Sequence, residues 1–497
     1  SKKRSYFYWF FSWLMCWGMF TVEYFYGQEF LRPLFLWIAL IPVIPEARKR
    51  IRAVICMWLP YLAVALAFLY WRVFVFEFPS YQPTLITELA TDFSGALLAL
   101  FTRVLHDLWT AGIGTWLQVF TLPYTGKILY LAIAAAAVGF LVVLGVLWMD
   151  SKANAPKESP RQALTWLGLG LASMLLAGPP FWVTGIPLEL TFPWDRTSLA
   201  FILGTSIFTV GIIRLLSYHS VQIVMVSLLT AFSIAVHSHN ANEYRKEWQL
   251  ERMFFNQLSW RIPVLDPGSM LILDYSPFNY HIDKFLAPAL NWMYGPDQQG
   301  LTQDYMLVDF YKVSDLFNNN PSGNEIVDRS YGTLKFASTL GQSIFIAYTP
   351  PGCLHVLDQS SPDFETITPG FEDAAIWSNR NLIHATTTTP AGPPDFFEPP
   401  ILNDWCFFYE KADLAAQSGE WEEVRQLGKQ AQAAGLSPRD QLEWLIFLKA
   451  ALNTGDGEQA QIILAKMESA GKMDIVCSYF KNEQNVRYPL IEASCSP

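Results

Sequence analysis

Residues 128–149 read ILYLAIAAAAVGFLVVLGVLWM and contain no charged side chain. A bilayer core of about 30 Å needs about 20 consecutive apolar residues in a helix, so this stretch is long enough to cross one. A helix that is apolar on every side is typical of a membrane span or of the core of a large protein. The stretch therefore predicts an integral membrane protein that has membrane lipids as its surroundings.

Further stretches have the same apolar character, and together they predict an α-helical membrane domain over residues 1–237. We expect about seven spans, at residues 6–22, 30–44, 53–76, 128–149, 163–183, 199–215 and 221–236. Residues 95–120 are also apolar but contain Arg103, His106 and Asp107. We expect this stretch to be either an amphipathic interfacial helix or a re-entrant hairpin, and the sequence does not choose between them.

The distribution of Lys and Arg predicts the orientation of the spans, because basic residues mark cytoplasmic loops. Basic residues gather at positions 2–4, 48–52, 152–161 and 214. If these segments are cytoplasmic, the N-terminus is cytoplasmic and everything after about residue 237 is extracytoplasmic. A single span at 95–120 would place the basic segment 152–161 outside, which is why we expect that stretch not to cross.

Charge divides the chain into two halves of different character. Residues 1–237 hold 16 Lys and Arg against 11 Asp and Glu, a net charge of +5, whereas residues 238–497 hold 18 against 33, a net charge of -15. Because affinity for nucleic acid depends on basic surface, the acidic half argues against a nucleic-acid partner.

The acidic half predicts two folded parts joined by a linker. Residues 238–385 alternate helical and strand-like stretches, with strands expected at 269–274, 305–310, 334–337, 343–348 and 353–357, so we expect an α/β domain. Residues 386–400 (TTTTPAGPPDFFEPP) predict an extended proline-rich linker. Residues 401–475 predict α-helices, and residues 476–497 form a tail.

The C-terminal helices favour a repeat. Helical stretches meet in pairs around Gly419 and around Gly455, and these glycines lie 36 residues apart, close to the tetratricopeptide period of about 34. We expect two tetratricopeptide-like units, with a plain four-helix end domain as the alternative. Repeats of this kind present surfaces that bind protein partners.

Four cysteines lie in the half that we expect outside the cytoplasm, where disulfides are permitted. Cys353, Cys406, Cys477 and Cys495 allow three pairings, and the sequence does not choose among them. Cys477 and Cys495 flank a short tail that a disulfide between them would hold. The sequence contains no CxxC or HExxH motif, so it predicts no metal site.

Charged residues near the predicted outer ends of the spans supply the candidate site. Asp195 and Arg196 follow Trp194 in a loop just before a span, and Arg72 lies near the end of another. A carboxylate can act as a general base on a hydroxyl or hold a divalent cation, so we expect Asp195 to be catalytic. An arginine pairs with phosphate oxygens, so we expect Arg196 and Arg72 to bind a lipid phosphate. The residues predict no other cofactor.

Four segments carry a resemblance to a known family: FLRPLFLWIALIPVI (30–44), YWRVFVFEF (70–78), FPWDR (192–196) and WCFFYEKADLAAQSGEW (405–421). With the overall architecture, they resemble bacterial inner-membrane proteins related to the C-type glycosyltransferases, nearest to relatives of the protein O-mannosyltransferases. The resemblance implies transfer of a sugar from a polyprenyl-phosphate donor to an extracytoplasmic acceptor.

The first predicted outer loop, EYFYGQE (23–29), departs from that family because it is short and lacks an adjacent acidic pair. No catalytic role is therefore carried over to Glu23 or Glu29. The departure keeps a second hypothesis open, in which the protein is a non-catalytic membrane scaffold or assembly subunit. Such a subunit would bind a protein partner through its C-terminal helices.

Overall fold

The structure is a computed structural model that describes most of the chain. The described residues are 9–14, 16–76, 83–150, 160–280, 283–317, 323–331, 334–359, 361, 367–368, 370–385, 404–482 and 488–495. The expected linker at 386–400 and the basic residues at 2–4 lie outside them.

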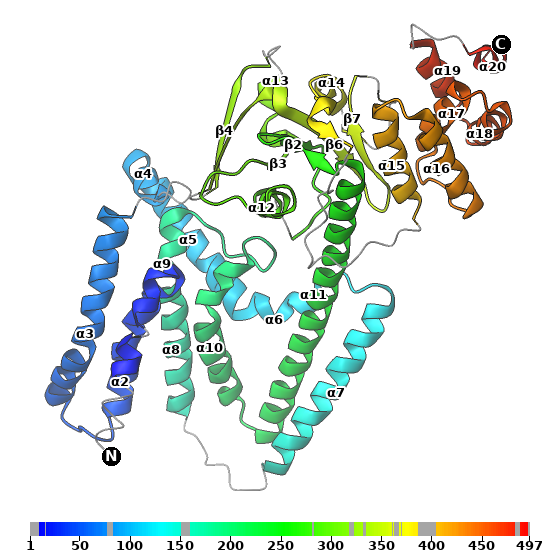
Figure 1. Cartoon of the computed structure of the whole chain (residues 1–497). Helices are drawn as coiled ribbons and strands as arrows, with labels where there is room; N and C mark the ends of the chain where they lie inside the picture. Colours follow the sequence, from blue (N-terminus) through cyan, green and yellow to red (C-terminus); the bar gives the residue numbers. More distant parts are fainter. Residues whose placement is uncertain are drawn as a thin grey trace. The chain divides into compact units, whose positions relative to one another are not determined.

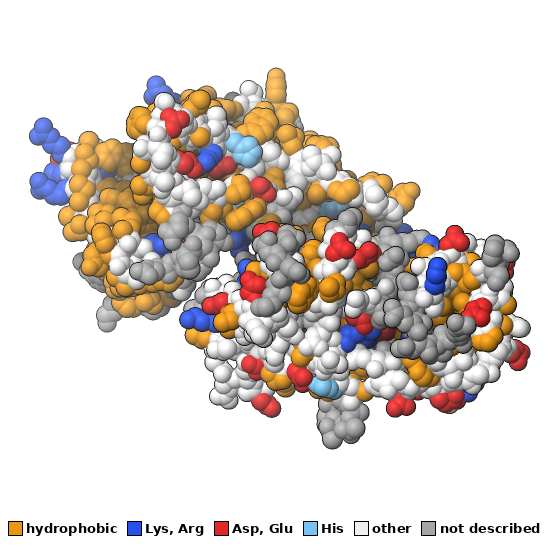
Figure 2. Space-filling view, turned by 90° about the horizontal axis from the view of Figure 1, so that it is seen from above, with side chains coloured by type: hydrophobic (Ala, Val, Ile, Leu, Met, Phe, Trp, Pro, Cys, Tyr) orange, Lys and Arg blue, Asp and Glu red, His pale blue; other side chains and the backbone are white. Residues whose placement is uncertain are grey.

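The chain forms two compact units, Ser1–Tyr244 and Arg245–Pro497, here called the first and second units. The boundary between the two units lies a few residues after residue 237, where the sequence divides into a positively charged half and a negatively charged half. Figure 2 shows hydrophobic side chains over much of the first unit and frequent acidic side chains on the second.

The first unit is built of helices. Its longer α-helices are α2 (Arg32–Leu40), α3 (Ala47–Phe74), α4 (Thr84–Thr91), α5 (Phe93–Trp109), α7 (Gly126–Asp150), α8 (Pro160–Ala177), α9 (Pro179–Thr184), α10 (Ile202–Leu215) and α11 (His219–Arg261), the last of which continues into the second unit. Segments of 3₁₀-helix, one π-helical segment and the three-residue α6 connect them: η1 (Trp17–Phe20), η2 (Glu23–Leu31), η3 (Thr110–Gly114), α6 (Thr115–Leu117), η4 (Gln118–Phe120) and η5 (Asp195–Ala200).

Five helices in the described residues are long and apolar enough to cross a membrane: Ala47–Phe74, Phe93–Phe120, Gly126–Asp150, Pro160–Thr184 and His219–Arg261. The membrane character expected from the sequence is therefore present. Four of the seven expected spans coincide with these helices. Of the other three, residues 199–215 correspond to the shorter helix Ile202–Leu215, residues 6–22 to the shorter helix Trp9–Phe20, and residues 30–44 to α2.

The stretch at 95–120 forms α5, η3, α6 and η4 in succession, and α5 is amphipathic. Its exposed apolar side chains include Leu97, Phe101 and Leu105, whereas Asp107 is buried. Figure 1 shows α5 and α6 running obliquely to α8 and α10. In the same view, α3, α8 and α11 rise while α7 and α10 descend, so their connections to one another alternate between the two ends of the bundle.

Close backbone approach joins α8 and α10 at the centre of the first unit. A Cβ atom on Gly170 would lie 2.4 Å from the backbone nitrogen of Phe208, and one on Gly211 would lie 2.7 Å from that of Leu167. Small residues at such crossings let membrane helices pack through their backbones.

A four-stranded sheet forms the centre of the second unit, in the order β3 (Met306–Asp309), β2 (Met270–Leu273), β6 (Ser343–Tyr348), β7 (Leu354–Leu357). The first three strands are parallel and β7 is antiparallel. Helix α12 (Asp283–Tyr294) connects β2 to β3. Two small pairs were not expected in full, β1 (Val264–Leu265) with β8 (Ile383–His384), and β4 (Ile326–Tyr331) with β5 (Leu334–Thr339).

Alternate residues of the buried strands enter two different cores. Met270 and Ile272 pack on one face of the sheet, and Leu271 and Leu273 pack on the other with residues of α11. Strands buried on both faces read as continuous apolar runs, which is why MLIL at 270–273 was recognisable as a strand. Smaller elements lie around the sheet: η6 (Phe310–Lys312), α13 (Ser314–Phe317), η7 (Leu340–Gln342), α14 (Phe371–Ala375) and η8 (Arg380–Leu382).

Two helix pairs follow the sheet, as expected: α15 (Trp405–Gln417) with α16 (Trp421–Ala433), and α17 (Trp444–Asn453) with α18 (Gly457–Ser469). Gly419 and Gly455 close them with positive φ values of 76° and 73°. The other helices of this part are η9 (Gln441–Glu443), α19 (Met473–Asn482) and α20 (Pro489–Ser494). Membership of the tetratricopeptide class stays a prediction.

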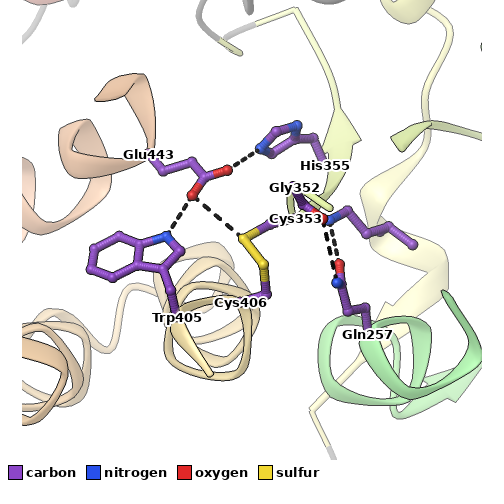
Figure 3. Close-up of a disulfide and its surroundings, with 8 residues drawn as sticks. Gln257, Gly352, Cys353, His355, Trp405, Cys406 and Glu443 are labelled. Carbon is purple, nitrogen blue, oxygen red and sulfur yellow. Dashed lines mark hydrogen bonds and ion pairs between the residues drawn. A yellow bond between two sulfur atoms is a disulfide. The ribbon is translucent and has the colours of Figure 1, made fainter. Parts of the chain in front are cut away.

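Disulfides hold these helices to the sheet and close the tail. Cys353 pairs with Cys406, and Cys477 pairs with Cys495, which is one of the three pairings that the sequence allows. Figure 3 shows the first disulfide beside the carboxylate of Glu443, which accepts a hydrogen bond from Trp405 Nε1 and lies 3.2 Å from His355 Nε2. The first helix pair and the sheet therefore share one core.

Candidate functional site

The loop before α10 ends in η5, whose first two residues are Asp195 and Arg196. Asp195 Oδ1 accepts the backbone N–H of Arg196 (2.9 Å), and the Thr197 hydroxyl donates to the carbonyl of Trp194 (2.7 Å). These local bonds satisfy backbone groups at the start of a short helix, as Asp and Thr commonly do. These hydrogen bonds fix the orientation of the first residues of η5.

Gln28 of η2 ties the other end of η5 to the bundle. Its amide Nε2 donates to the carbonyls of Ala200 (2.9 Å) and Ser173 (3.1 Å), and its Oε1 accepts from the hydroxyl of Ser173 (2.9 Å). Gly27 permits this approach, since a Cβ atom there would lie 1.6 Å from the carbonyl oxygen of Leu176. Because both the nitrogen and the oxygen of its amide are hydrogen-bonded, Gln28 stabilises one position of η5.

A cavity of about 590 Å³ lies beside η5. Its walls come from the η3–η4 segment, the loop at 188–190, η5, α10 and α11, and most of its surface is apolar. The lining residues are Ala111, Thr115, Trp116, Gln118, Leu188, Leu190, Asp195, Arg196, Ser198, Leu199, Phe201, Ile202, Thr205, Ser206, Phe232, Ser233, Val236, His237 and Asn240. A mainly apolar cavity with a few convergent polar groups is the usual form of a small-molecule site.

One wall of the cavity contains a π-helical turn, η3, between α5 and α6. The Thr115 hydroxyl donates to the carbonyls of Thr110 (3.0 Å) and Ala111 (3.2 Å), and the Thr205 hydroxyl of α10 also donates to Ala111 (3.0 Å). Hydroxyls of this kind satisfy carbonyls that an irregular turn frees within a membrane helix. Turns of this kind occur frequently at functional sites.

The structure brings Asp195 and Arg196 together in the cavity but places Arg72 elsewhere. Arg72 Nε lies 2.7 Å from Glu23 Oε2, and its guanidinium lies over the ring of Phe76, 5.6 Å from the centroid. Arg72 is not among the described residues that line the cavity. Its role in binding a lipid phosphate at this site therefore has no geometric support.

Other charged residues of the first unit also form pairs. Arg32 makes two bonds of 2.8 Å to Glu29, and Arg103 Nη2 lies 3.3 Å from Glu88. In each pair the carboxylate offsets the charge of the arginine and so leaves less of it for a ligand. This distinguishes them from Asp195, for which no ion pair occurs among the described residues.

The sequence suggested solvated interfacial histidines at His237 and His239 and gave neither a role in the site. His237 lines the cavity from α11, whereas His239, two residues further along the helix, is buried against the ring of Tyr124 at 5.1 Å. Ser233, His237 and Asn240 lie on the cavity side of an otherwise apolar helix face. Their spacing of four and three residues is the signal that could have identified this face.

The described residues contain no group of three or more His, Cys, Asp or Glu side chains arranged to hold a metal ion. Among the described residues of the lining, Asp195 is the acidic side chain that could offer a charged oxygen to a cation. No known protein family, curated protein or solved structure matches this chain. The cavity offers a guanidinium, a carboxylate and an imidazole within a mainly apolar lining.

Proposed function

We propose that the protein is a membrane glycosyltransferase that takes a sugar from a polyprenyl-phosphate donor and transfers it to an extracytoplasmic acceptor. The observation that carries the proposal is that Asp195 and Arg196 share one largely apolar cavity of about 590 Å³ between membrane-type helices. Arg196 would pair with the lipid phosphate, as guanidinium groups do. The apolar side chains of the lining would receive the first part of the isoprenoid chain.

The orientation of the site follows from the positive-inside rule. Basic residues lie at the start of α3 (Arg48), at the start of α8 (Arg161) and at the end of α10 (Arg214). In Figure 1, α7 and α10 descend toward the end at which α3, α8 and α11 begin. We place that end in the cytoplasm and the loop that precedes η5 on the extracytoplasmic side. The N-terminus would then be cytoplasmic, and the second unit would lie outside the inner membrane.

Asp195 would act on the sugar from within the cavity. Its carboxylate can stabilise the positive charge that develops at the anomeric carbon, or act as a base toward the acceptor. Removal of one such electrostatic contact typically lowers kcat by about 10²–10³-fold. The proposal therefore requires that Asp195 affect turnover strongly.

The test is transfer of labelled sugar from synthetic farnesyl phosphomannose or farnesyl phosphoglucose by the full-length chain in nanodiscs. Asp195→Asn should abolish most of the transfer, while the matched control Asp150→Asn, at the exposed end of α7, should behave as the wild type. Equal turnover by the two variants would remove Asp195 from the site. A wild-type chain that neither transfers sugar nor binds the phosphate would contradict the proposal.

A scaffold function is the second candidate, and the helix pairs α15–α18 favour it. They form two successive antiparallel pairs, and the disulfide Cys353–Cys406 holds the first of them to the sheet. A fixed pair of hairpins is a suitable platform for a protein partner. A chain that lacks transferase activity but co-purifies with a defined membrane partner, and loses it when exposed residues of α16 and α18 are changed, would support this function instead.

A further inference from the structure

We propose that His237 is the general base that takes the proton from the acceptor hydroxyl. The inference rests on the proposed function and assigns the residue that activates the acceptor at the same cavity. The base that the sequence suggested was Asp195, so the inference also separates the tasks of the two residues.

The geometry of α11 directs His237 toward the cavity. Five of its residues line the cavity, Phe232, Ser233, Val236, His237 and Asn240. They recur at intervals of three and four residues and so form one face of the helix. The imidazole of His237 is exposed, so its ring can reach a ligand, whereas His239 is only 4% exposed.

The lining contains three titratable side chains among the described residues: Asp195, Arg196 and His237. A guanidinium stays protonated in proteins and accepts no proton. The candidates for a base are therefore Asp195 and His237. Asp195 uses Oδ1 to hold the N–H of Arg196 at the start of η5, which keeps its carboxylate beside the arginine that would hold the phosphate.

His237 lies on a different element from Asp195 and Arg196. A base must approach the acceptor oxygen, whereas the phosphate leaves on the opposite side of the sugar carbon in a direct displacement. With the leaving-group residues on η5 and the base on α11, the two groups can act from different walls of one cavity. Imidazole is also the side chain most often used as a general base.

In the proposed step, the acceptor oxygen forms a bond to the anomeric carbon while its proton moves to a ring nitrogen of His237. The bond between that carbon and the phosphate oxygen breaks, and both of its electrons leave with the lipid phosphate, whose charge pairs with Arg196. Asp195 stabilises the positive charge on the sugar, and the protonated imidazole returns its proton to water.

The experiment uses the full-length chain in nanodiscs with farnesyl phosphomannose and farnesyl phosphoglucose as donors and with water or a threonine-containing peptide as acceptor. His237→Ala should lower kcat by about 10²–10⁴-fold, the usual contribution of a general base. The affinity for farnesyl phosphate, measured by native mass spectrometry, should not change. Added imidazole should restore turnover, because an exposed position leaves room for it. The matched control is His219→Ala, an exposed histidine at the start of the same helix.

The outcomes separate this inference from the function on which it rests. If the wild type binds farnesyl phosphate no better than farnesol, the proposed function fails. If the phosphate is bound through Arg196 but His237→Ala turns over as the wild type does, the assignment of His237 is wrong. Loss of turnover that imidazole does not restore, or a wild type that binds the phosphate but transfers no sugar, would also overturn it.

Discussion

Two carboxylates on α15, Glu410 and Asp413, test most directly the forces that hold the second unit together. Asp413 accepts hydrogen bonds from Arg261, whose side chain is fully buried, and from Arg380 (3.0 Å). Burial raises the pKa of Asp413, but the charges of Arg261 and Arg380 outweigh this effect and hold the pKa below its usual value. Asp413 is therefore the ionised partner of two arginines.

Glu410, one turn earlier, is in the opposite situation. It is fully buried, and neither of its carboxyl oxygens has a hydrogen-bond partner among the described residues. The nearby N–H of Leu354 donates to Gln257 instead (2.6 Å). Burial raises the pKa of Glu410 well above its usual value, and the charge of Arg261 offsets this only in part. Glu410 therefore keeps its proton over a pH range in which the unfolded chain has lost it.

The sign of the pH dependence follows from these shifts. Below the unfolded pKa of about 4.3, Glu410 is protonated in both states and has no effect. Above it, the unfolded state releases a proton that the folded state retains, so stability falls by about 1.4 kcal/mol per pH unit until the folded pKa is reached. Glu410→Gln removes this slope and should stabilise α15 increasingly as the pH rises from the unfolded pKa toward the raised folded one.

Asp413→Asn should behave in the opposite way. It leaves the buried charge of Arg261 without its partner, which typically costs about 3–5 kcal/mol. Because the pKa of Asp413 is lowered, its contribution is complete above the unfolded pKa and is lost as the pH falls through the folded one. The two variants therefore differ in sign at neutral pH although they lie one turn apart.

The assay is hydrogen exchange of peptides from α15 in the full-length chain, with opening free energies compared between the wild type and the two variants at a series of pH values. We expect Glu410→Gln to slow the exchange and to flatten the pH dependence of the opening free energy. Asp413→Asn should speed the exchange. If Glu410→Gln destabilised α15 as much as Asp413→Asn, or left the slope unchanged, the assignment of a retained proton to Glu410 would be refuted.

Three further predictions concern single contacts. Gln28→Met removes the hydrogen bonds that hold Ala200 to α8 and should cost about 1–3 kcal/mol, seen as a lower thermal midpoint of the first unit. Replacing Cys353 and Cys406 with Ala opens a loop with a sequence separation of 53 and should cost about 4 kcal/mol in denaturant unfolding, about 1 kcal/mol more than loss of the other disulfide, whose separation is 18. Arg72→Gln should leave the affinity for farnesyl phosphate unchanged in native mass spectrometry, because Arg72 lies outside the cavity lining; a clear loss of affinity would return it to the site.

The sequence predicted elements whose pattern is local. The uncharged run that became α7 and the buried runs that became β2 and β6 are continuous in the chain, and the helix pairs end at glycines that adopt positive φ. The pair β4–β5 was expected only in part, because Ile326–Tyr331 carries polar residues and gains its strand form from a neighbour. Local pattern therefore gives the type of an element more readily than its partner.

The site was only partly predictable for the same reason. Arg72 and Arg196 look alike in the sequence, and what separates them is their position: Arg196 lines the cavity, whereas Arg72 contacts Glu23, which lies 49 residues earlier in the chain. His237 and His239 also look alike until the rotation of α11 places one of them in the cavity and the other against Tyr124. Both distinctions depend on tertiary contacts that a single sequence does not display.

Arg196 is proposed to bind the phosphate of a lipid in the cavity. The most direct measurement compares the affinities of the full-length chain for farnesyl phosphate and for uncharged farnesol, in the wild type, in Arg196→Gln and in the exposed control Arg161→Gln. A hydrogen bond to a charged group contributes about 1.5–3 kcal/mol, so Arg196→Gln should weaken farnesyl phosphate by about 10–150-fold and leave farnesol unchanged. Equal preference for the phosphate in all three proteins would contradict the account.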